Sequence, residues 1–153
     1  SKLNQVKAPN FKLMSTSNKM IELNKLKSKF VVLYFYPKDN TSGCTIETND
    51  FNKLLSKFKK YDCEIFGISK DSIDSHNKWS RKLKLKFELL SDENKASLKA
   101  YKVWAKKKFM GKEFLGTVRS TFVIKNKKII KEWRNVRVAG HAEEVLNFVK
   151  NYN

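Results

Sequence analysis

Apolar residues gather in short runs along the chain, and polar segments separate these runs. The longest run, FVVLYFY, extends from Phe30 to Tyr36 and is ended by Pro37. A continuous apolar run of this length predicts a strand that is buried on both faces. CEIFGIS, from Cys63 to Ser69, predicts a second buried strand, and LKFELL, from Leu85 to Leu90, is a shorter apolar run.

Helical spacing of apolar residues follows the first predicted strand. Phe51, Leu54, Leu55 and Phe58 recur three or four positions apart, as on one buried face of a helix. The segment from Asp92 opens with acidic residues, which favour the start of a helix. Helices are predicted over four segments: Cys44 to Lys60, Ser72 to Leu83, Asp92 to Tyr101 and His141 to Tyr152.

The last strands of the pattern form a hairpin. STFVIK (Ser120 to Lys125) and KIIKEWR (Lys128 to Arg134) flank the pair Asn126-Lys127, which predicts a tight turn. Strands that alternate with helices, followed by a hairpin, predict an α/β fold with a central mixed sheet flanked by helices. The segment from Lys102 to Gly116 has no clear period, so we expect an irregular surface segment there. The length of 153 residues predicts a single domain, residues 1–153.

The chain is strongly basic. It has 33 basic and 15 acidic residues, for a formal net charge of +18. Such a surface attracts polyanions, so non-specific nucleic acid is a possible partner. Two lysine groups could follow a phosphate backbone: Lys106, Lys107 and Lys108, and Lys125, Lys127, Lys128 and Lys131. However, only Arg81, Arg119, Arg134 and Arg137 are arginines, which argues against reading of base edges. A compositional bias toward Lys and Asn is the simpler explanation of the charge.

Several classes of protein do not fit the composition. No run approaches the ~18 apolar residues that span a bilayer, so we expect a soluble domain with no membrane partner. Two cysteines are few for a secreted disulfide scaffold, which indicates a reducing intracellular compartment, cytoplasmic or nuclear. The cysteines and the two histidines, His76 and His141, have no zinc-like spacing, so neither a metal nor another cofactor is expected.

Cys44 is the candidate for chemistry. It lies in the first turn of a predicted helix, directly after the longest buried strand. Free backbone N–H groups and the helix dipole favour an anion at this place, and the thiolate is the nucleophilic form of cysteine. A buried, inert cysteine is the alternative, because free cysteines are commonly buried. The position alone leaves both interpretations open.

Pro37, Thr41 and Cys44 stand in the spacing P-x-x-x-T-x-x-C, which resembles the active-site signature of the peroxiredoxins. The flanking LYFYPKDNTSGCT is similar to the bacterioferritin-comigratory, or peroxiredoxin Q, branch of that family. The likeness continues through GISKDSIDSH, LLSDE, YKVWAKKKFMGKEFLG, VRSTFVI and GHAEEVL, and it covers the chain from about Val6 to Val149. The resemblance implies a thioredoxin-like fold and an antioxidant thiol peroxidase that reduces hydrogen peroxide and organic hydroperoxides.

The resemblance also implies roles for individual residues. Cys44 would be the peroxidatic cysteine, which attacks a peroxide oxygen and becomes a sulfenic acid. Thr41 would aim its hydroxyl at the thiolate and the peroxide, unless it only caps the helix. Pro37 would shape the loop and shield the thiolate from water. Arg119 would place a positive charge beside Cys44, and Glu47 would be a supporting residue that orients Arg119 or backbone groups.

The sequence departs from the branch at the resolving cysteine. Many members carry that cysteine five residues after the peroxidatic one, where this chain has Asn49. Cys63 is a possible resolving residue, but it opens an apolar strand and so is more simply explained as a buried structural thiol. A one-cysteine cycle with an external thiol, such as thioredoxin, glutaredoxin or glutathione, is therefore favoured. Ser42 replaces a frequent Pro, and Lys102 replaces a usual Gly.

Three other functions compete with the peroxidase. A thioredoxin-type disulfide exchanger needs C-x-x-C, and position 47 is Glu, so this class is excluded. A nucleic-acid-binding module, alone or combined with a peroxidase, stays open, although no recognised nucleic-acid motif is present. A redox sensor that relays oxidation to a partner protein would share the first chemical step. We expect a monomer or a weak dimer.

Overall fold

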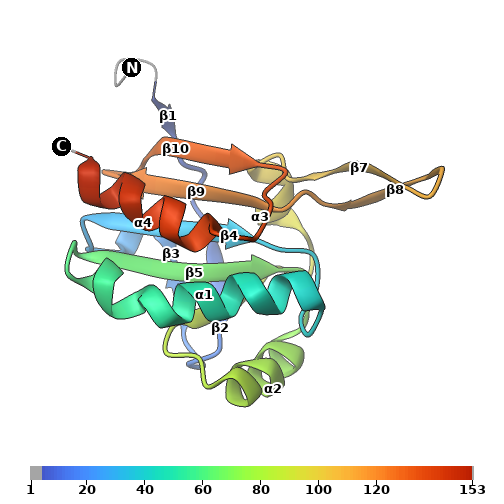
Figure 1. Ribbon diagram of the computed structural model, residues 1–153, viewed down its shortest axis with the longest axis horizontal. Coiled ribbons are helices and arrows are strands. Elements are labelled where there is room, and N and C mark those ends of the chain that lie inside the picture. The colour runs from blue at the N-terminus through green and yellow to red at the C-terminus, as the bar shows by residue number, and fades with distance from the viewer. Residues whose placement is uncertain (1–4, 153) are drawn as a thin grey trace.

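The computed structural model describes residues 5–152, and it has a mixed sheet at its centre (Figure 1). The strands of this sheet are β1 (Val6–Lys7), β2 (Lys12–Ser15), β3 (Met20–Glu22), β4 (Phe30–Phe35), β5 (Cys63–Ser69), β6 (Glu88–Ser91), β9 (Ser120–Lys125) and β10 (Lys128–Arg134). They lie in the order β1-β10-β9-β4-β5-β6-β2-β3. The helices are α1 (Ser42–Lys59), α2 (Ile73–Leu83), α3 (Ala96–Ala100) and α4 (His141–Asn151), with a 3₁₀ turn, η2, at Leu23–Lys25.

Strand β4 lies in the middle of the sheet, parallel to β5 and antiparallel to β9. All six of its side chains are buried, and they alternate between two apolar clusters. Phe30, Val32 and Tyr34 pack with residues of α1 and α4 on the face that Figure 1 shows. The other three residues of β4 pack with α3 and the N-terminal strands. Burial on both faces is the reason that this strand has no polar alternation.

The predicted fold class is confirmed. Helices α1 and α2 connect the parallel strands β4, β5 and β6. The late hairpin adds antiparallel strands, as predicted, and β1, β2 and β3 near the N-terminus also pair antiparallel. Asn126 and Lys127 both have positive φ, 52° and 63°, which the tight turn of a right-twisted hairpin requires. The single domain over residues 1–153 stays a prediction, and residues 1–4 and 153 lie outside the described part.

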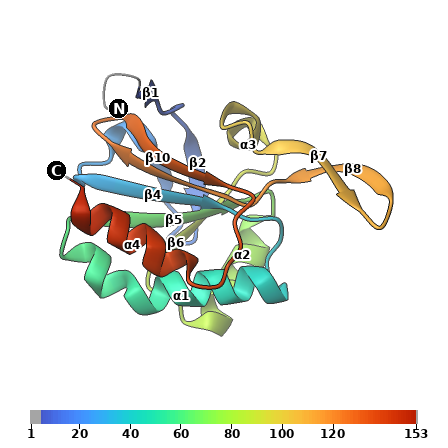
Figure 2. The ribbon, with the colours of Figure 1, turned by 45° about the horizontal axis from the view of Figure 1, so that its top comes forward.

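Two predictions about secondary structure were wrong. The segment Lys102 to Gly116 is not irregular: it contains the antiparallel strands β7 (Trp104–Phe109) and β8 (Lys112–Thr117), which form a separate sheet (Figure 2). Most of this hairpin is exposed on both faces, so burial imposes no alternating pattern on its sequence. The helix predicted from Asp92 is the short α3, because the buried Asp92 side chain accepts a hydrogen bond from Leu98 N and the chain turns at Lys95 (φ 64°).

Strands β1, β2 and β3 were not predicted, since they are short and partly exposed. Lys102, where the family usually has Gly, adopts a φ of 59°, a backbone conformation that favours glycine. Among the described residues, no helix is both long enough and apolar enough to cross a bilayer.

Candidate active site

Cys44 is the third residue of helix α1, which begins directly beyond the loop that follows β4. Thr41 is the N-cap residue, with extended backbone dihedrals, so the helix starts two residues earlier than predicted. The Cys44 thiol therefore lies among the first N–H groups of the helix, where the dipole favours negative charge. Cys44 is only 1% exposed, so solvent has almost no access to its sulfur.

Arg119 lies between Cys44 and Glu47. One guanidinium nitrogen, Nη2, is 3.2 Å from Cys44 Sγ, and the other, Nη1, donates to Glu47 Oε1 at 2.7 Å. Burial alone would lower the pKa of Arg119, but Glu47 and Cys44 outweigh burial and raise it. Gly43 keeps this place open, because a Cβ there would lie 3.3 Å from Arg119 Nη2. The arrangement holds a permanent positive charge against the sulfur.

Glu47 is one helical turn beyond Cys44 and is buried. Its Oε1 accepts the bond from Arg119, whereas Oε2 has no hydrogen-bond partner among the described residues. Burial raises the pKa of Glu47 to about 7, against the opposing charge of Arg119, and Asp50 raises it further. Glu47 therefore fixes one edge of the guanidinium and leaves the other edge for the sulfur.

The structure places Thr41 and Pro37 in the loop before α1, but it does not show the predicted contact between the Thr41 hydroxyl and Cys44. The hydroxyl donates to Lys38 O at 2.9 Å, and it makes no capping bond to the helix. Pro37 is half-buried, directly after Tyr36, whose N–H still bonds to Ile68 O of β5. The catalytic roles of Thr41 and Pro37 stay predictions.

A buried polar network that sequence reasoning missed anchors this loop. Asp39 Oδ1 accepts from Tyr36 Oη at 2.7 Å, and Oδ2 accepts from Ser75 Oγ at 2.8 Å and lies 2.7 Å from His76 Nδ1. His76 Nε2 lies 2.9 Å from Leu90 O. Both ring nitrogens of His76 lie within hydrogen-bond distance of oxygen atoms, so the ring links the Asp39 side chain to strand β6. Burial, and then the charge of Asp39, raise the pKa of Tyr36, which keeps its hydroxyl a donor.

Asp39, Asp71 and His76 are also close enough to hold a metal ion, with ligand atoms within 4.8 Å of one another. Hydrogen bonds already engage these atoms. Asp71 Oδ2 accepts from Ser69 Oγ at 2.6 Å and from Asp39 N at 2.9 Å, beside the bonds of Asp39 to His76 and its neighbours. The absence of a metal from the chemistry stays a prediction.

Cys63 is far from Cys44. It begins β5 opposite Phe30, at the start of β4, whereas Cys44 follows the other end of β4. At ~3.3 Å per residue, the strand separates the two cysteines by about 20 Å. Burial, and then Glu64 and Asp62, raise the pKa of Cys63, so its thiol stays protonated. A disulfide needs Cα atoms within ~7 Å, so Cys63 cannot reach Cys44 in this fold.

Lys107, on strand β7, is a second cation near the site; the sequence groups it with Lys106 and Lys108 as a phosphate contact and not with Cys44. Its Nζ donates to Thr117 O at 2.9 Å, two residues before Arg119. Burial and then the charge of Arg119 lower the pKa of Lys107, while Cys44 raises it. The base of the β7–β8 hairpin therefore borders the site.

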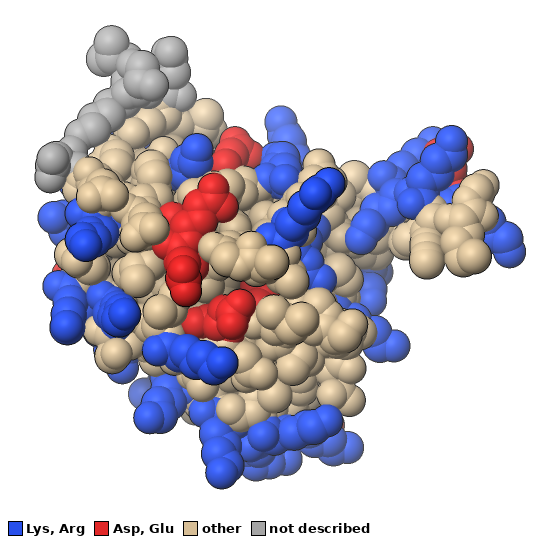
Figure 3. All heavy atoms as spheres, in the orientation of Figure 1, with Lys and Arg blue, Asp and Glu red and all other residues tan. Residues whose placement is uncertain are grey.

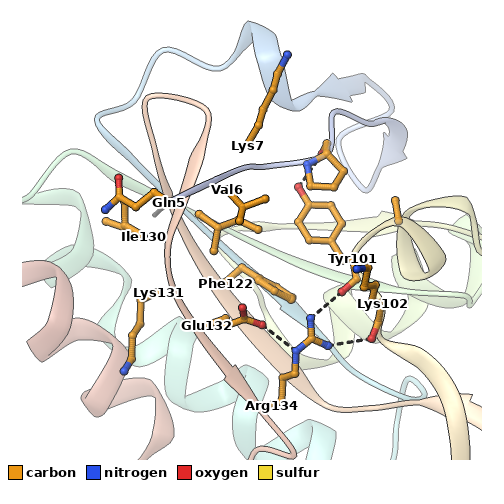
Figure 4. A pocket seen from close by; sticks show the side chains of 13 residues that line it. Gln5, Val6, Lys7, Tyr101, Lys102, Phe122, Ile130, Lys131, Glu132 and Arg134 are labelled. Carbon is orange, nitrogen blue, oxygen red and sulfur yellow. Dashed lines mark hydrogen bonds and ion pairs between the residues drawn. The ribbon is translucent and has the colours of Figure 1, made fainter. Parts of the chain in front are cut away.

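A pocket of about 580 Å³ lies away from these residues (Figure 4). Val6, Phe122 and Arg134 line it, and Arg134 donates across it to the carbonyls of Tyr101 and Lys102. Phe122 and Tyr101 belong to the apolar cluster on the opposite side of the sheet from the cluster that contains Cys44. The pocket contains none of the predicted site residues.

A buried cysteine at a helix N-terminus, faced by an arginine that directly precedes a central strand of a mixed α/β sheet, is typical of a thioredoxin-like cysteine oxidoreductase. Residues 5–133 match the AhpC/TSA family, so the chain belongs to the AhpC/TSA family. The predicted resemblance to the peroxiredoxins is confirmed, and the protein is a thiol-dependent peroxidase.

Relatives cover nearly the whole chain. It is 43% identical over 145 residues to Peroxiredoxin Bcp of Bacillus subtilis, which covers 94% of this chain and 92% of the relative. It is 44% identical over 140 residues to a putative peroxiredoxin bcp of Helicobacter pylori, with coverage of 91% and 92%. The solved bacterioferritin comigratory protein of Xanthomonas campestris, which has alkyl peroxide reduction activity, superposes with a TM-score of 0.87 at 40% identity, over 92% of this chain and 90% of that chain.

We expect His76→Leu to destabilise the fold. The substitution leaves the buried Asp39 side chain without its hydrogen-bond partner at His76 Nδ1, and a buried polar group that loses its partner typically costs about 1–3 kcal/mol. Urea unfolding measures the change, with Lys78→Ala, an exposed residue on the same helix, as the control. A loss below about 1 kcal/mol would show that the fold does not depend on the hydrogen bond between Asp39 and the His76 ring.

The raised pKa of Glu47 predicts that the stability of the fold depends on pH. Because folding raises its pKa from 4.5 to about 7, the unfolded chain releases this proton first as the pH rises. The protein should therefore lose stability relative to Glu47→Gln between pH 4.5 and about 7, with a constant difference above that range. Urea unfolding across this range tests the sign, and Glu143→Gln controls for loss of a surface carboxylate. A difference that grows in favour of Glu47 as the pH rises would contradict the argument.

Proposed function

We propose that Cys44 is the peroxidatic cysteine and that the protein works by a one-cysteine cycle. The 3.2 Å contact between Arg119 Nη2 and Cys44 Sγ carries the proposal. The contact places a permanent positive charge next to the Cys44 thiol. Cys44 lies at a helix N-terminus, whereas Cys63, the other cysteine, begins a strand. Both features stabilise the thiolate, which is the nucleophile.

In the first step, the thiolate attacks the terminal oxygen of a hydroperoxide. An S–O bond forms, the O–O bond breaks, and the alkoxide or hydroxide that leaves takes a proton to become an alcohol or water. Negative charge moves from the sulfur to the peroxide oxygens during this step. Arg119 is placed to stabilise that charge, while Glu47 holds the guanidinium in position. Thr41 and Pro37 form the loop that borders the reacting atoms.

In the second step, an external thiol reduces the sulfenic acid. It attacks the oxidised sulfur, water leaves, and a mixed disulfide forms; a second thiol then releases Cys44 and leaves as a disulfide. Asn49 cannot take this part, and Cys63 lies at the far end of β4. Thioredoxin, glutaredoxin and glutathione are the candidate reductants, and a reducing cytoplasm would supply them.

The substrates we propose are hydrogen peroxide and organic hydroperoxides. The relative from Xanthomonas campestris has alkyl peroxide reduction activity, and it shares the fold over 92% of this chain. Reaction at the terminal oxygen requires no particular organic group, so both kinds of peroxide suit the same chemistry.

Binding of nucleic acid remains a separate hypothesis that rests on the net charge of +18. On the face that Figure 3 shows, lysine and arginine side chains lie mostly around the edge and along the hairpin, while acidic side chains gather at the centre. This distribution does not favour one continuous phosphate-binding stripe on that face.

We expect Cys44→Ser to abolish peroxidase activity and Cys63→Ser to retain most of it with the same reductant. Mass spectrometry of the oxidised protein should show sulfenic acid, and sulfinic acid at higher peroxide, because no second thiol is near. The Cys63→Ser variant is the matched control, since it removes the other thiol. A stoichiometric Cys44–Cys63 disulfide after one equivalent of peroxide would refute the one-cysteine cycle.

Arg119→Met should slow the reaction of the reduced protein with hydrogen peroxide by about 10²–10³-fold, as loss of a preorganised charge at a reacting oxygen typically does. Single-turnover kinetics isolate this step from reduction. Arg137→Met removes an exposed arginine and should leave the rate unchanged. A slowing of less than about threefold would remove Arg119 from the catalytic residues.

A further inference from the structure

The β7–β8 hairpin forms an arm that projects from the body of the protein (Figures 1 and 2). Half of the exposed large apolar side chains in the described residues lie on it: Phe109 (56% exposed), Met110 (90%), Phe114 (47%) and Leu115 (58%). Its charge is basic, with Lys106, Lys107, Lys108 and Lys112 against Glu113. Figure 3 shows basic and uncharged side chains next to one another along the arm. Exposed apolar residues of this density mark an interaction surface.

The register of the hairpin divides the arm into two faces. Lys107 pairs with Phe114, and Phe109 pairs with Lys112, so these four side chains share one face, which we call the site face. Lys106, Lys108 and Leu115 lie on the other face, which we call the outer face.

Contacts at the base of the arm orient these faces. Lys107 reaches Thr117 O and interacts electrostatically with Arg119 and Cys44, so the site face continues into the active site. Trp104, on the outer face, lies under Lys95 Nζ, next to α3. The outer face therefore turns toward α3 and away from Cys44.

The chemistry of Cys44 indicates which partner covers the site face. The thiol is 1% exposed, and its sulfenic acid must receive a sulfur from another molecule. A partner that places a thiol there must rest against the first turn of α1 and the base of the arm. Each strand of the arm has six residues, about 20 Å, which is longer than glutathione needs but comparable to the size of a domain of ~100 residues.

We propose that the site face docks a protein thiol reductase of acidic surface, which delivers its thiol to oxidised Cys44. The proposal rests on the external-thiol cycle proposed above. Phe109 and Phe114 provide apolar contact area, and the lysines attract the acidic partner and orient it. The partner's first thiol forms a mixed disulfide with Cys44 as water leaves, and its second thiol releases Cys44, so the partner departs oxidised.

Phe114 and Leu115 supply a matched pair of variants. They are neighbours on β8, both exposed, and they lie on opposite faces of the arm. The test measures turnover of hydrogen peroxide with thioredoxin and its reductase, and separately with dithiothreitol, which needs no docking surface. Phe114→Ser should lower kcat/KM for thioredoxin by about tenfold, as loss of a buried aromatic contact does, and leave turnover with dithiothreitol unchanged. Leu115→Ser should change neither value by more than about twofold.

Phe109→Ser, farther from the base of the arm, should repeat the loss. Because the Phe114 ring lies next to Gly116, this second variant separates loss of the contact surface from a local folding defect at the base. If the Phe114 and Leu115 variants have the same kcat/KM for thioredoxin, and turnover with dithiothreitol is normal, the docking proposal is overturned while the external-thiol cycle stands. No turnover of the unmodified protein with either reductant would contradict the external-thiol cycle, and the docking proposal with it.

Two further outcomes would also overturn the proposal. If Phe114→Ser slows single-turnover reaction with cumene hydroperoxide but not with hydrogen peroxide, the site face binds the substrate's organic group. If light scattering shows a dimer that Phe114→Ser dissociates while thioredoxin kinetics stay unchanged, the site face binds a second copy of the chain.

Discussion

The positive charge of Arg119 is the interaction on which the site depends. It contacts Cys44 and Glu47, two buried groups of α1 that would otherwise lack a counter-charge. Placing a thiolate and a carboxylate a single helical turn apart in a buried region is costly unless a cation separates them. The raised pKa of Glu47, at about 7, shows that burial is only partly offset. The second carboxylate oxygen of Glu47, Oε2, is buried without a hydrogen-bond partner among the described residues. This costs stability, but the same carboxylate holds the Arg119 guanidinium in its orientation toward Cys44.

The rest of the fold brings Arg119 to that position. Arg119 directly precedes β9, which is the neighbour of β4, and α1 follows the loop at the end of β4. The start of β9 therefore lies beside the end of β4, and Arg119 meets Cys44 although the two residues are 75 positions apart in the sequence. The loop itself is fixed from beneath by Asp39 and His76, whose hydrogen bonds tie it to α2 and β6. A loop held in this way keeps the reacting sulfur in a constant position relative to the charge.

The Cys44 sulfur is buried, but the reaction cycle requires that an external thiol reach it. A buried thiol suits a small peroxide and limits side reactions, but the oxidised sulfur must still meet an external thiol. The arm beside the site reconciles the two requirements, because it can recognise a partner over an area outside the buried centre. Its exposed aromatic side chains carry a cost in solubility, which the surrounding lysines offset.

The sequence by itself determined the elements whose signal is local. The continuous apolar run of β4, the helical spacing behind Cys44 and the Asn126-Lys127 turn each follow from the physics of neighbouring residues, and all three are present in the structure. The signature around Cys44 identified the family and, through it, Arg119 and Glu47 as site residues. Spacing alone gave no reason to join Arg119 to Cys44.

Only the tertiary structure decided what depends on sheet order and burial. His76 lies 37 residues from Asp39, and no local pattern shows that both are buried against each other. Lys107 appeared as one lysine in a run of three, and only the register of its hairpin shows that it faces the site. The arm itself was missed because alternation of apolar and polar residues arises when one face of a strand is buried, and most of this hairpin buries neither.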